Sequence, residues 1–217
     1  MYHDTDDMQV NFSHPDAPRI TLPSDTAEIV ETLVEALCDD PVTAWVFPGP
    51  DRPTVLPGFF RTVVEELFKY GEIYLTEDGT GALLSMPPGA PPPTPEQRES
   101  YARRMRARVG EFADRTVLPI ENLLEAAHPR DRDHYYIVFY GVRTSHQGRG
   151  VGSKLLRRIT DRADFDGAGT YIECSTQRSL NLALRCGFRA ERPIGLPGGP
   201  ELYPAWREPG AHTGPTD

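Results

Sequence analysis

The chain has 217 residues and a net charge of −9, and this length suits one domain with a core of its own. The acidic balance opposes non-specific binding to nucleic acid and favours a cationic substrate. Its three cysteines are widely spaced, without a C-x-x-C pair, so we expect neither a disulfide framework nor a metal site. With no long apolar run and no signal-peptide pattern, the sequence indicates a cytoplasmic monomer or homodimer without membrane or nucleic-acid partners.

Both ends of the chain are polar or rich in proline and glycine. Residues 1–18 and 208–217 lack apolar periodicity, which predicts flexible segments. A single domain is therefore expected over residues 19–207, without internal repeats.

Helical spacing of apolar residues begins after Asp25, which we expect to cap a first helix. A loop over 41–50 should separate it from a second helix, whose apolar residues recur from Leu56 to Phe68. Strands are predicted over 72–76 and 81–86, because an Asp-Gly turn lies between them.

The second half of the chain alternates strands and helices. We expect polar helices over 94–112 and 116–127, an apolar strand over 134–142, a helix after Gly150, a strand over 170–174 and a helix over 177–186. A strand, a glycine-rich turn, a helix, a strand and a helix in this order predict an α/β fold. Its central sheet should be mixed and partly parallel, with helices on its faces.

The glycine-rich turn has the character of an anion site. Three glycines between Gln147 and Ser153 let the backbone approach a ligand, and the free N–H groups of the following helix would point at it. Neither G-x-G-x-x-G nor the P-loop motif fits, because Ser153 stands where each needs a glycine. The glycines alone would also suit a turn without a ligand.

Here the chain resembles the GNAT superfamily, whose pyrophosphate loop Q/R-x-x-G-x-G/A is matched by Gln147, Gly150 and Gly152. The resemblance covers residues 135–188 and includes a Gly-Val pair and a Gly-Phe pair, at Gly141 and Val142 and at Gly187 and Phe188. Within the superfamily, three segments are most similar to the puromycin N-acetyltransferase group: 146–152, 171–175 and 196–200.

The resemblance implies the GNAT fold and an N-acyltransferase with acetyl-CoA as acyl donor and a small-molecule amine as acceptor, in antibiotic modification or biosynthesis. Backbone N–H groups of the loop would hold the pyrophosphate, the strand end would bind the pantetheine arm, and an N–H near Val142 would stabilise the oxyanion. The residues so implied in coenzyme A binding are Gly141, Val142, Gln147, Gly148, Arg149, Gly150, Val151, Gly152, Ser153 and Ser179. Arg149 would equally suit a solvent-facing turn.

Glu173 lies in an otherwise apolar or small strand, where burying an unpaired carboxylate is costly. The resemblance places this glutamate opposite the acceptor, where it would hold or deprotonate the amine. The alternative is a glutamate on a solvent-facing side of the strand.

One position departs from the family pattern, because Ala183 stands where GNAT enzymes commonly carry the tyrosine that protonates the leaving thiolate. Cys186, Tyr140 and Tyr203 are alternative proton donors, although each also suits a packing role. The departure keeps two other interpretations open, an enzyme with a different acyl thioester donor and a non-catalytic coenzyme A-binding module.

The acceptor site of this fold is usually built by the segment between the first two helices. That segment contains Asp39, Asp40, Trp45 and Phe47, which would hold a cationic, ring-bearing amine through charge and cation–π contact. An interpretation of equal weight is that the aspartates end a helix and the aromatic rings cover the core.

Overall fold

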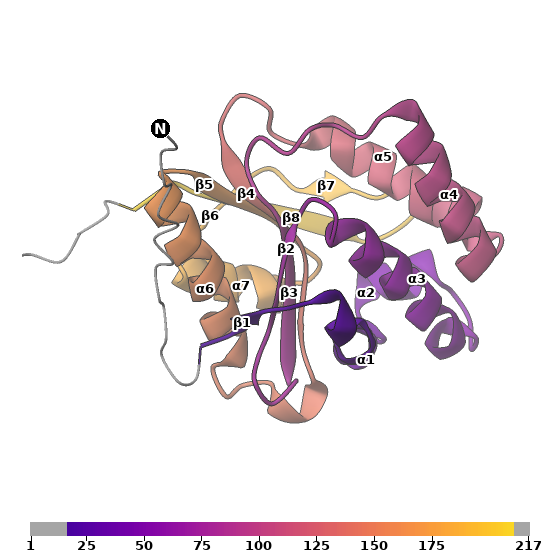
Figure 1. Ribbon diagram of the computed structural model, residues 1–217, viewed down its shortest axis with the longest axis horizontal. Coiled ribbons are helices and arrows are strands. Elements are labelled where there is room, and N and C mark those ends of the chain that lie inside the picture. Colours follow the sequence, from indigo (N-terminus) through magenta and orange to yellow (C-terminus); the bar gives the residue numbers. More distant parts are fainter. Residues whose placement is uncertain (1–16, 211–217) are drawn as a thin grey trace, which may run out of the picture.

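The computed structural model describes residues 17–210 and shows a mixed sheet with helices on both faces (Figure 1). Residues 1–16 and 211–217, most of the two segments that we expect to be flexible, lie outside this range.

The sheet has the strand order β1-β2-β3-β4-β5-β8-β6, and β7 pairs with β8. Every pair is antiparallel apart from β4 and β5, which run parallel because α6 crosses between them. The strands are β1 (Arg19–Ile20), β2 (Glu72–Leu75), β3 (Gly81–Met86), β4 (His134–Val142), β5 (Gly169–Cys174), β6 (Arg189–Ala190), β7 (Ile194–Gly195) and β8 (Glu201–Arg207).

Helices cover both faces of the sheet, with α6 and α7 on one side and α1 and α3 on the other (Figure 1). Each side has its own apolar core, one centred on α1 and α3 and the other on α6 and α7. The helices are α1 (Thr26–Leu37), α2 (Pro41–Val46), α3 (Arg52–Leu67), α4 (Pro95–Val109), α5 (Leu118–Ala127), α6 (Val151–Asp166) and α7 (Gln177–Arg185), with short 3-10 turns at Pro23–Asp25 and Thr144–His146 and a π-helical turn at Ala113–Val117.

The parallel pair separates halfway along β4. Pairing with β5 runs from His134 to Ile137, which lies opposite Ile172, whereas pairing with β3 on the other edge continues to Val142. Residues 138–142 of β4 therefore have no ladder partner on the side of β5. Backbone N–H and C=O groups are strong hydrogen-bonding groups, so this edge is available to a ligand.

The segment 41–50 differs from the expected loop, because α2 occupies its first half. Pro41 is the first residue of this helix, a position where its missing N–H is not needed. Asp40 caps it, with Oδ1 accepting hydrogen bonds from the N–H groups of Val42 (2.9 Å) and Thr43 (3.2 Å). We had interpreted proline after two aspartates as a break, although it begins a helix.

Asp25 is the N-cap residue of α1 as predicted, but its side chain forms no capping hydrogen bond to this helix. Its carboxylate instead accepts hydrogen bonds from Arg19 at 2.7 Å and from the N–H of Leu22 at 2.8 Å.

None of the helices within residues 17–210 is both long and apolar enough to cross a membrane.

Candidate active site

A cavity of about 1480 Å³ opens where β4 and β5 separate. Its walls include β4 from Tyr136 to Val142, the end of β5, the glycine-rich loop before α6, and parts of α1, α2, α4 and α5. The cavity thus connects the expected coenzyme A loop with the surface expected to receive the acceptor.

The loop before α6 has the backbone geometry of an anion cradle. Gly148 and Gly150 have φ values of 77° and 84°, in the left-handed region that residues with a Cβ rarely adopt. A Cβ added at either position would meet no atom within 4 Å, so the space above the loop is open. Gly150 is also the N-cap of α6, whose first-turn N–H groups face this space without a side-chain cap. The loop therefore fits a pyrophosphate group.

Two other residues of the motif hold the loop in place. The side chain of Gln147 donates a hydrogen bond from Nε2 to the carbonyl oxygen of Val142 at 3.0 Å, which ties the loop to the end of β4. At Gly152 a Cβ would lie 2.9 Å from Leu182, so glycine allows α6 to approach α7 closely. Both residues therefore act on the position of the cradle.

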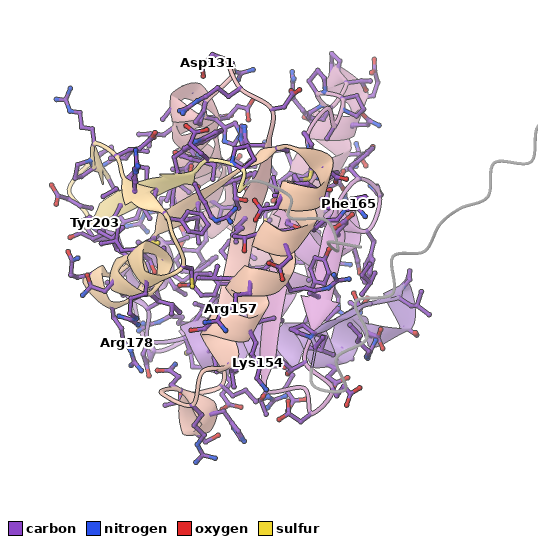
Figure 2. The ribbon with its side chains drawn as sticks, turned by 90° about the vertical axis from the view of Figure 1, so that its left-hand side faces the viewer. Asp131, Lys154, Arg157, Phe165, Arg178 and Tyr203 are labelled. Carbon is purple, nitrogen blue, oxygen red and sulfur yellow. The ribbon has the colours of Figure 1, made fainter. Side chains whose placement is uncertain are left out.

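Basic side chains lie near the cradle despite the acidic composition of the chain. Figure 2 shows Lys154 and Arg178 toward the ends of α6 and α7 from which these helices begin, with Arg157 further along α6. Arg178 and Arg185 also border the cavity. Positive charge here would attract a polyphosphate ligand.

The expected coenzyme A residues divide into those that reach the cavity and those that do not. The lining includes Gly141, Val142, Gln147, Gly148, Gly150, Gly152, Ser153 and Ser179. Arg149 and Val151 are outside the lining, and Arg149 is exposed on the turn. The Ser179 hydroxyl forms a capping box with Thr176 at the start of α7, so it already has a structural role.

Glu173 lies on the cavity wall at the end of β5. Its Oε1 atom is buried and has no hydrogen-bond partner among the described residues. Burial raises the pKa of the carboxyl to about 7, although the nearby hydroxyls of Tyr136 and Tyr171 oppose this rise by stabilising the charged form. A carboxylate with this pKa in a cavity can accept a proton near neutral pH.

The three alternative proton donors and Ala183, the position that lacks one, have different surroundings. Ala183, on α7, is fully buried against the core, so no open cleft lies beside it. Cys186 and Tyr203 pack against the same core and lie outside the cavity lining. Tyr140, on β4, does line the cavity, and burial raises the pKa of its hydroxyl, which therefore stays protonated.

The residues expected to bind the acceptor have structural partners. Both carboxylate oxygens of Asp40 are engaged, since Oδ1 caps α2 and Oδ2 accepts a hydrogen bond from Ser175. Phe47 is 1% exposed and packs edge-on against Phe59, with ring centroids 5.2 Å apart. Asp39, Asp40 and Phe47 line the cavity, whereas Trp45 lies against Gly199 outside it.

The sequence analysis missed a further carboxylate on the cavity wall, Glu121 of α5. We had considered α5 a polar helix without a role in the site. Helical spacing alone places Glu121 in one row with Val117, Leu124 and His128, but only the structure shows that this row borders the cavity. Tyr136 and Tyr171, beside Glu173, were also missed.

Comparison with known proteins agrees with this geometry. Residues 118–188 match the Acetyltransferase (GNAT) family. An uncharacterized N-acetyltransferase of Schizosaccharomyces pombe is 27% identical over 190 residues, which are 79% of this chain and 74% of that protein.

Solved structures of acetyltransferases share the fold. One, described as histone acetyltransferase HPA2 and related acetyltransferase from Corynebacterium glutamicum, is 25% identical with a TM-score of 0.66, covering 91% of this chain and 99% of that one. Arylalkylamine N-acetyltransferase 2 from Aedes aegypti is 16% identical with a TM-score of 0.59, covering 91% of this chain and all of that one (100%).

Proposed function

Because residues 118–188 match the Acetyltransferase (GNAT) family and the fold is that of solved acetyltransferases, we propose that the chain is a GNAT-family enzyme that transfers an acetyl group from acetyl-CoA to the amine of a small molecule. The observation that carries this proposal is the unpaired edge of β4 over 138–142. One cavity joins that edge to the glycine cradle before α6 and to the carboxylate of Glu173. A thioester lying along the edge would therefore have its phosphates in the cradle and its reactive end near Glu173.

Acetyl-CoA would supply an activated acyl group that an uncharged amine can attack. The cradle at Gly148 and Gly150 would bind the pyrophosphate, and the edge of β4 would orient the arm through backbone hydrogen bonds. The interior walls of the cavity would limit the access of water to the reacting atoms.

Glu173 is the residue proposed to take the proton from the attacking amine, directly or through a water molecule. Its unpartnered Oε1 and its pKa of about 7 support this role, because a general base works best with a pKa near the working pH. Its own strand holds it in place, with Glu173 opposite Pro204 in the β5–β8 ladder.

Tyr140 is the residue proposed to give a proton to the leaving thiolate. Its place on β4, directly before Gly141 and Val142, brings its side chain to the part of the cavity where the thioester would lie. The buried alanine at 183 leaves that task to another group, and Cys186 and Tyr203 do not reach the cavity. A tyrosine on β4 would thus replace the one that the family commonly carries on α7.

The acceptor is proposed to be a small-molecule amine, which the acidic net charge and the name of the Aedes arylalkylamine enzyme support. An antibiotic amine is the finer proposal, and it depends on the likeness of 146–152 and 171–175 to puromycin N-acetyltransferases.

Ala183 favours a second candidate function, a module that binds coenzyme A without turnover.

Binding of coenzyme A tests the cradle directly. The ligand should raise the melting temperature, because binding to the folded state alone contributes about 2.7 kcal/mol at a hundredfold excess over Kd. Gly150→Asp should abolish this shift, since its carboxylate would repel the pyrophosphate. Gly167→Asp is the matched control, because Gly167 has a similar φ of 67° at the opposite end of α6. An equal shift in both variants would place the ligand elsewhere.

A further inference from the structure

Several carboxylates besides Glu173 line the cavity, and one of them, Glu121, is buried and has no role in the proposed reaction. Glu121 lies in the first turn of α5, within the segment that connects β3 to β4, and it borders the same cavity as Glu173. Figure 1 shows α4 and α5 lying together on the side of the molecule away from α6 and α7. This wall is therefore separate from the wall that holds the proposed coenzyme A cradle.

The contacts of Glu121 leave its charge without a counterion. Its Oε1 accepts a hydrogen bond from the hydroxyl of Tyr101 on α4 at 2.6 Å. No cation forms an ion pair with it in the part of the chain that the structure describes. Burial raises the pKa of this carboxyl to about 7, and the Tyr101 hydrogen bond opposes the rise. A carboxylate in such a position gains most from a cationic ligand.

The two other glutamates near this wall have cationic partners within the protein. Glu66 is paired with Lys69 at 2.7 Å and with Arg104, and Glu125 is paired with Arg130 at 2.6 Å. His128 is neutral at pH 7 because burial and His134 lower its pKa to about 4. The titratable and charged groups that line the cavity around Glu121 are Glu66, Tyr70, Arg98, Tyr101, Glu125, His128, Arg130 and Tyr136.

Glu121 and Glu173 line the same cavity as Tyr136. Burial raises the pKa of the Tyr136 hydroxyl, and the charge of Glu173 and, more weakly, that of Glu121 add to this effect. Both carboxylates are thus within electrostatic range of one phenol oxygen. Because both carboxylates also border the same cavity, an acceptor with a cationic group at each end can approach both from within it.

We propose that the acceptor carries a second cationic group, an ammonium or a guanidinium, which Glu121 binds while the reacting amine faces Glu173. This inference rests on the proposed acetyl transfer, and it narrows the acceptor class to diamines and amino-guanidines. The reacting amine loses its proton to Glu173, whereas the distal group keeps its proton and its charge. The distal cation would supply the counterion that Glu121 lacks.

The alternative role for Glu121 is structural. Its carboxylate joins α5 to Tyr101 of α4, and an acidic residue in the first turn of a helix is favourable for the helix dipole. If Glu121 is only structural, replacing it would destabilise the fold, and the loss of activity would be the same for every substrate. Selectivity between substrates is therefore the measurement that separates the two roles.

The experiment compares a series of alkyl diamines with monoamines in which a methyl group replaces the distal amine. The ratio of their kcat/KM values cancels every step that the two substrates share, including those at Glu173. In the wild-type protein this ratio should favour the diamine by about tenfold or more, because a desolvated charge pair contributes strongly to binding. A parallel amino-guanidine series distinguishes the two kinds of distal cation.

Glu121→Gln should reduce the ratio to about one while the fold remains intact, since the amide oxygen can still accept the Tyr101 hydrogen bond. The matched control is Glu111→Gln, an exposed glutamate in the turn after α4 and outside the cavity lining, and it should keep the wild-type ratio. A ratio near one in the wild type, or a ratio that Glu121→Gln leaves unchanged, would overturn the inference.

The pH dependence of the ratio gives an independent signature. A carboxyl with a pKa of about 7 is only about one-tenth ionised at about pH 6. The preference for the diamine should therefore rise several-fold between about pH 6 and pH 8, and Glu121→Gln should remove this dependence. A wild-type ratio that is flat over this range would contradict the role of Glu121.

Binding measured without acetyl-CoA separates the two proposals. A diamine should raise the melting temperature of the wild type and of Glu111→Gln, and not that of Glu121→Gln. If diamines bind in this pattern and no amine is acetylated, the proposed function fails while the subsite stands. If amines are acetylated with no preference for a distal cation, the subsite fails while the proposed function stands.

Discussion

Glutamine in place of Glu173 should make the protein more stable at alkaline pH and less active. The native state raises the pKa of this carboxyl from 4.5 to about 7 through burial, so it binds the proton more tightly than the unfolded chain does. The contribution of Glu173 to stability is therefore greatest below pH 4.5 and is lost as the pH rises through about 7. Glutamine has no such dependence.

The size of the effect follows from the shift. At about 1.4 kcal/mol for each pKa unit, a rise from 4.5 to about 7 corresponds to at most roughly 3 to 4 kcal/mol. The carboxyl faces a cavity that admits water, which reduces the expected value to about 1 to 2 kcal/mol.

Urea unfolding at several pH values measures this directly. The free energy of unfolding of Glu173→Gln minus that of the wild type should grow between about pH 5 and pH 8 and then level off. The same subtraction for Glu201→Gln, an exposed glutamate on β8, is the control for a general change in net charge. A difference that stays constant or falls with pH would refute the assignment of a buried, destabilised carboxylate at position 173.

Three further substitutions test the neighbours of the site. Tyr140→Phe should lower kcat by about 10²-fold or more if its hydroxyl protonates the thiolate, whereas coenzyme A should still raise the melting temperature. An unchanged kcat in a stopped-flow or steady-state assay would exclude Tyr140 as the proton donor. Ala183→Tyr should cost roughly 1 to 3 kcal/mol in urea unfolding without any gain in rate, because the position is fully buried, and a faster enzyme would contradict the packed environment. Cys186→Ala should leave turnover within about twofold of the wild type, since its thiol lies outside the cavity lining, and a large loss would return the thiol to the mechanism.

The parts of the fold that the sequence predicted are those with strong periodicity. The strand from His134 to Val142 was predicted with its observed bounds, because a continuous apolar and aromatic run of this length is typical of a central strand buried on both faces. The helix after Gly150 was predicted from the glycine turn and the apolar spacing that follows it. The helix α2 was missed, because its six residues are too few to show a periodic pattern.

The site could be predicted from the sequence only where the role of a residue depends on its neighbours in the sequence. The glycines of the loop could be identified from the motif, since backbone conformation and ligand approach depend on adjacent residues. Glu121 could not, because it reaches the cavity through the packing of α5 beside α4, on a segment far from β5 in the sequence. The burial of Ala183 likewise depends on the contact of α7 with the sheet. Counting residues along the sequence locates this position but does not show that it is buried.

The release of free thiol from acetyl-CoA in the presence of primary amines tests the central claim most directly. We expect thiol release that depends on the amine, with a product heavier than the amine by one acetyl group, and we expect Gly150→Asp and Glu173→Gln to suppress it. Acetyl-CoA that raises the melting temperature and yet releases no thiol with any monoamine, diamine or amino-guanidine would contradict the account and favour a coenzyme A-binding module.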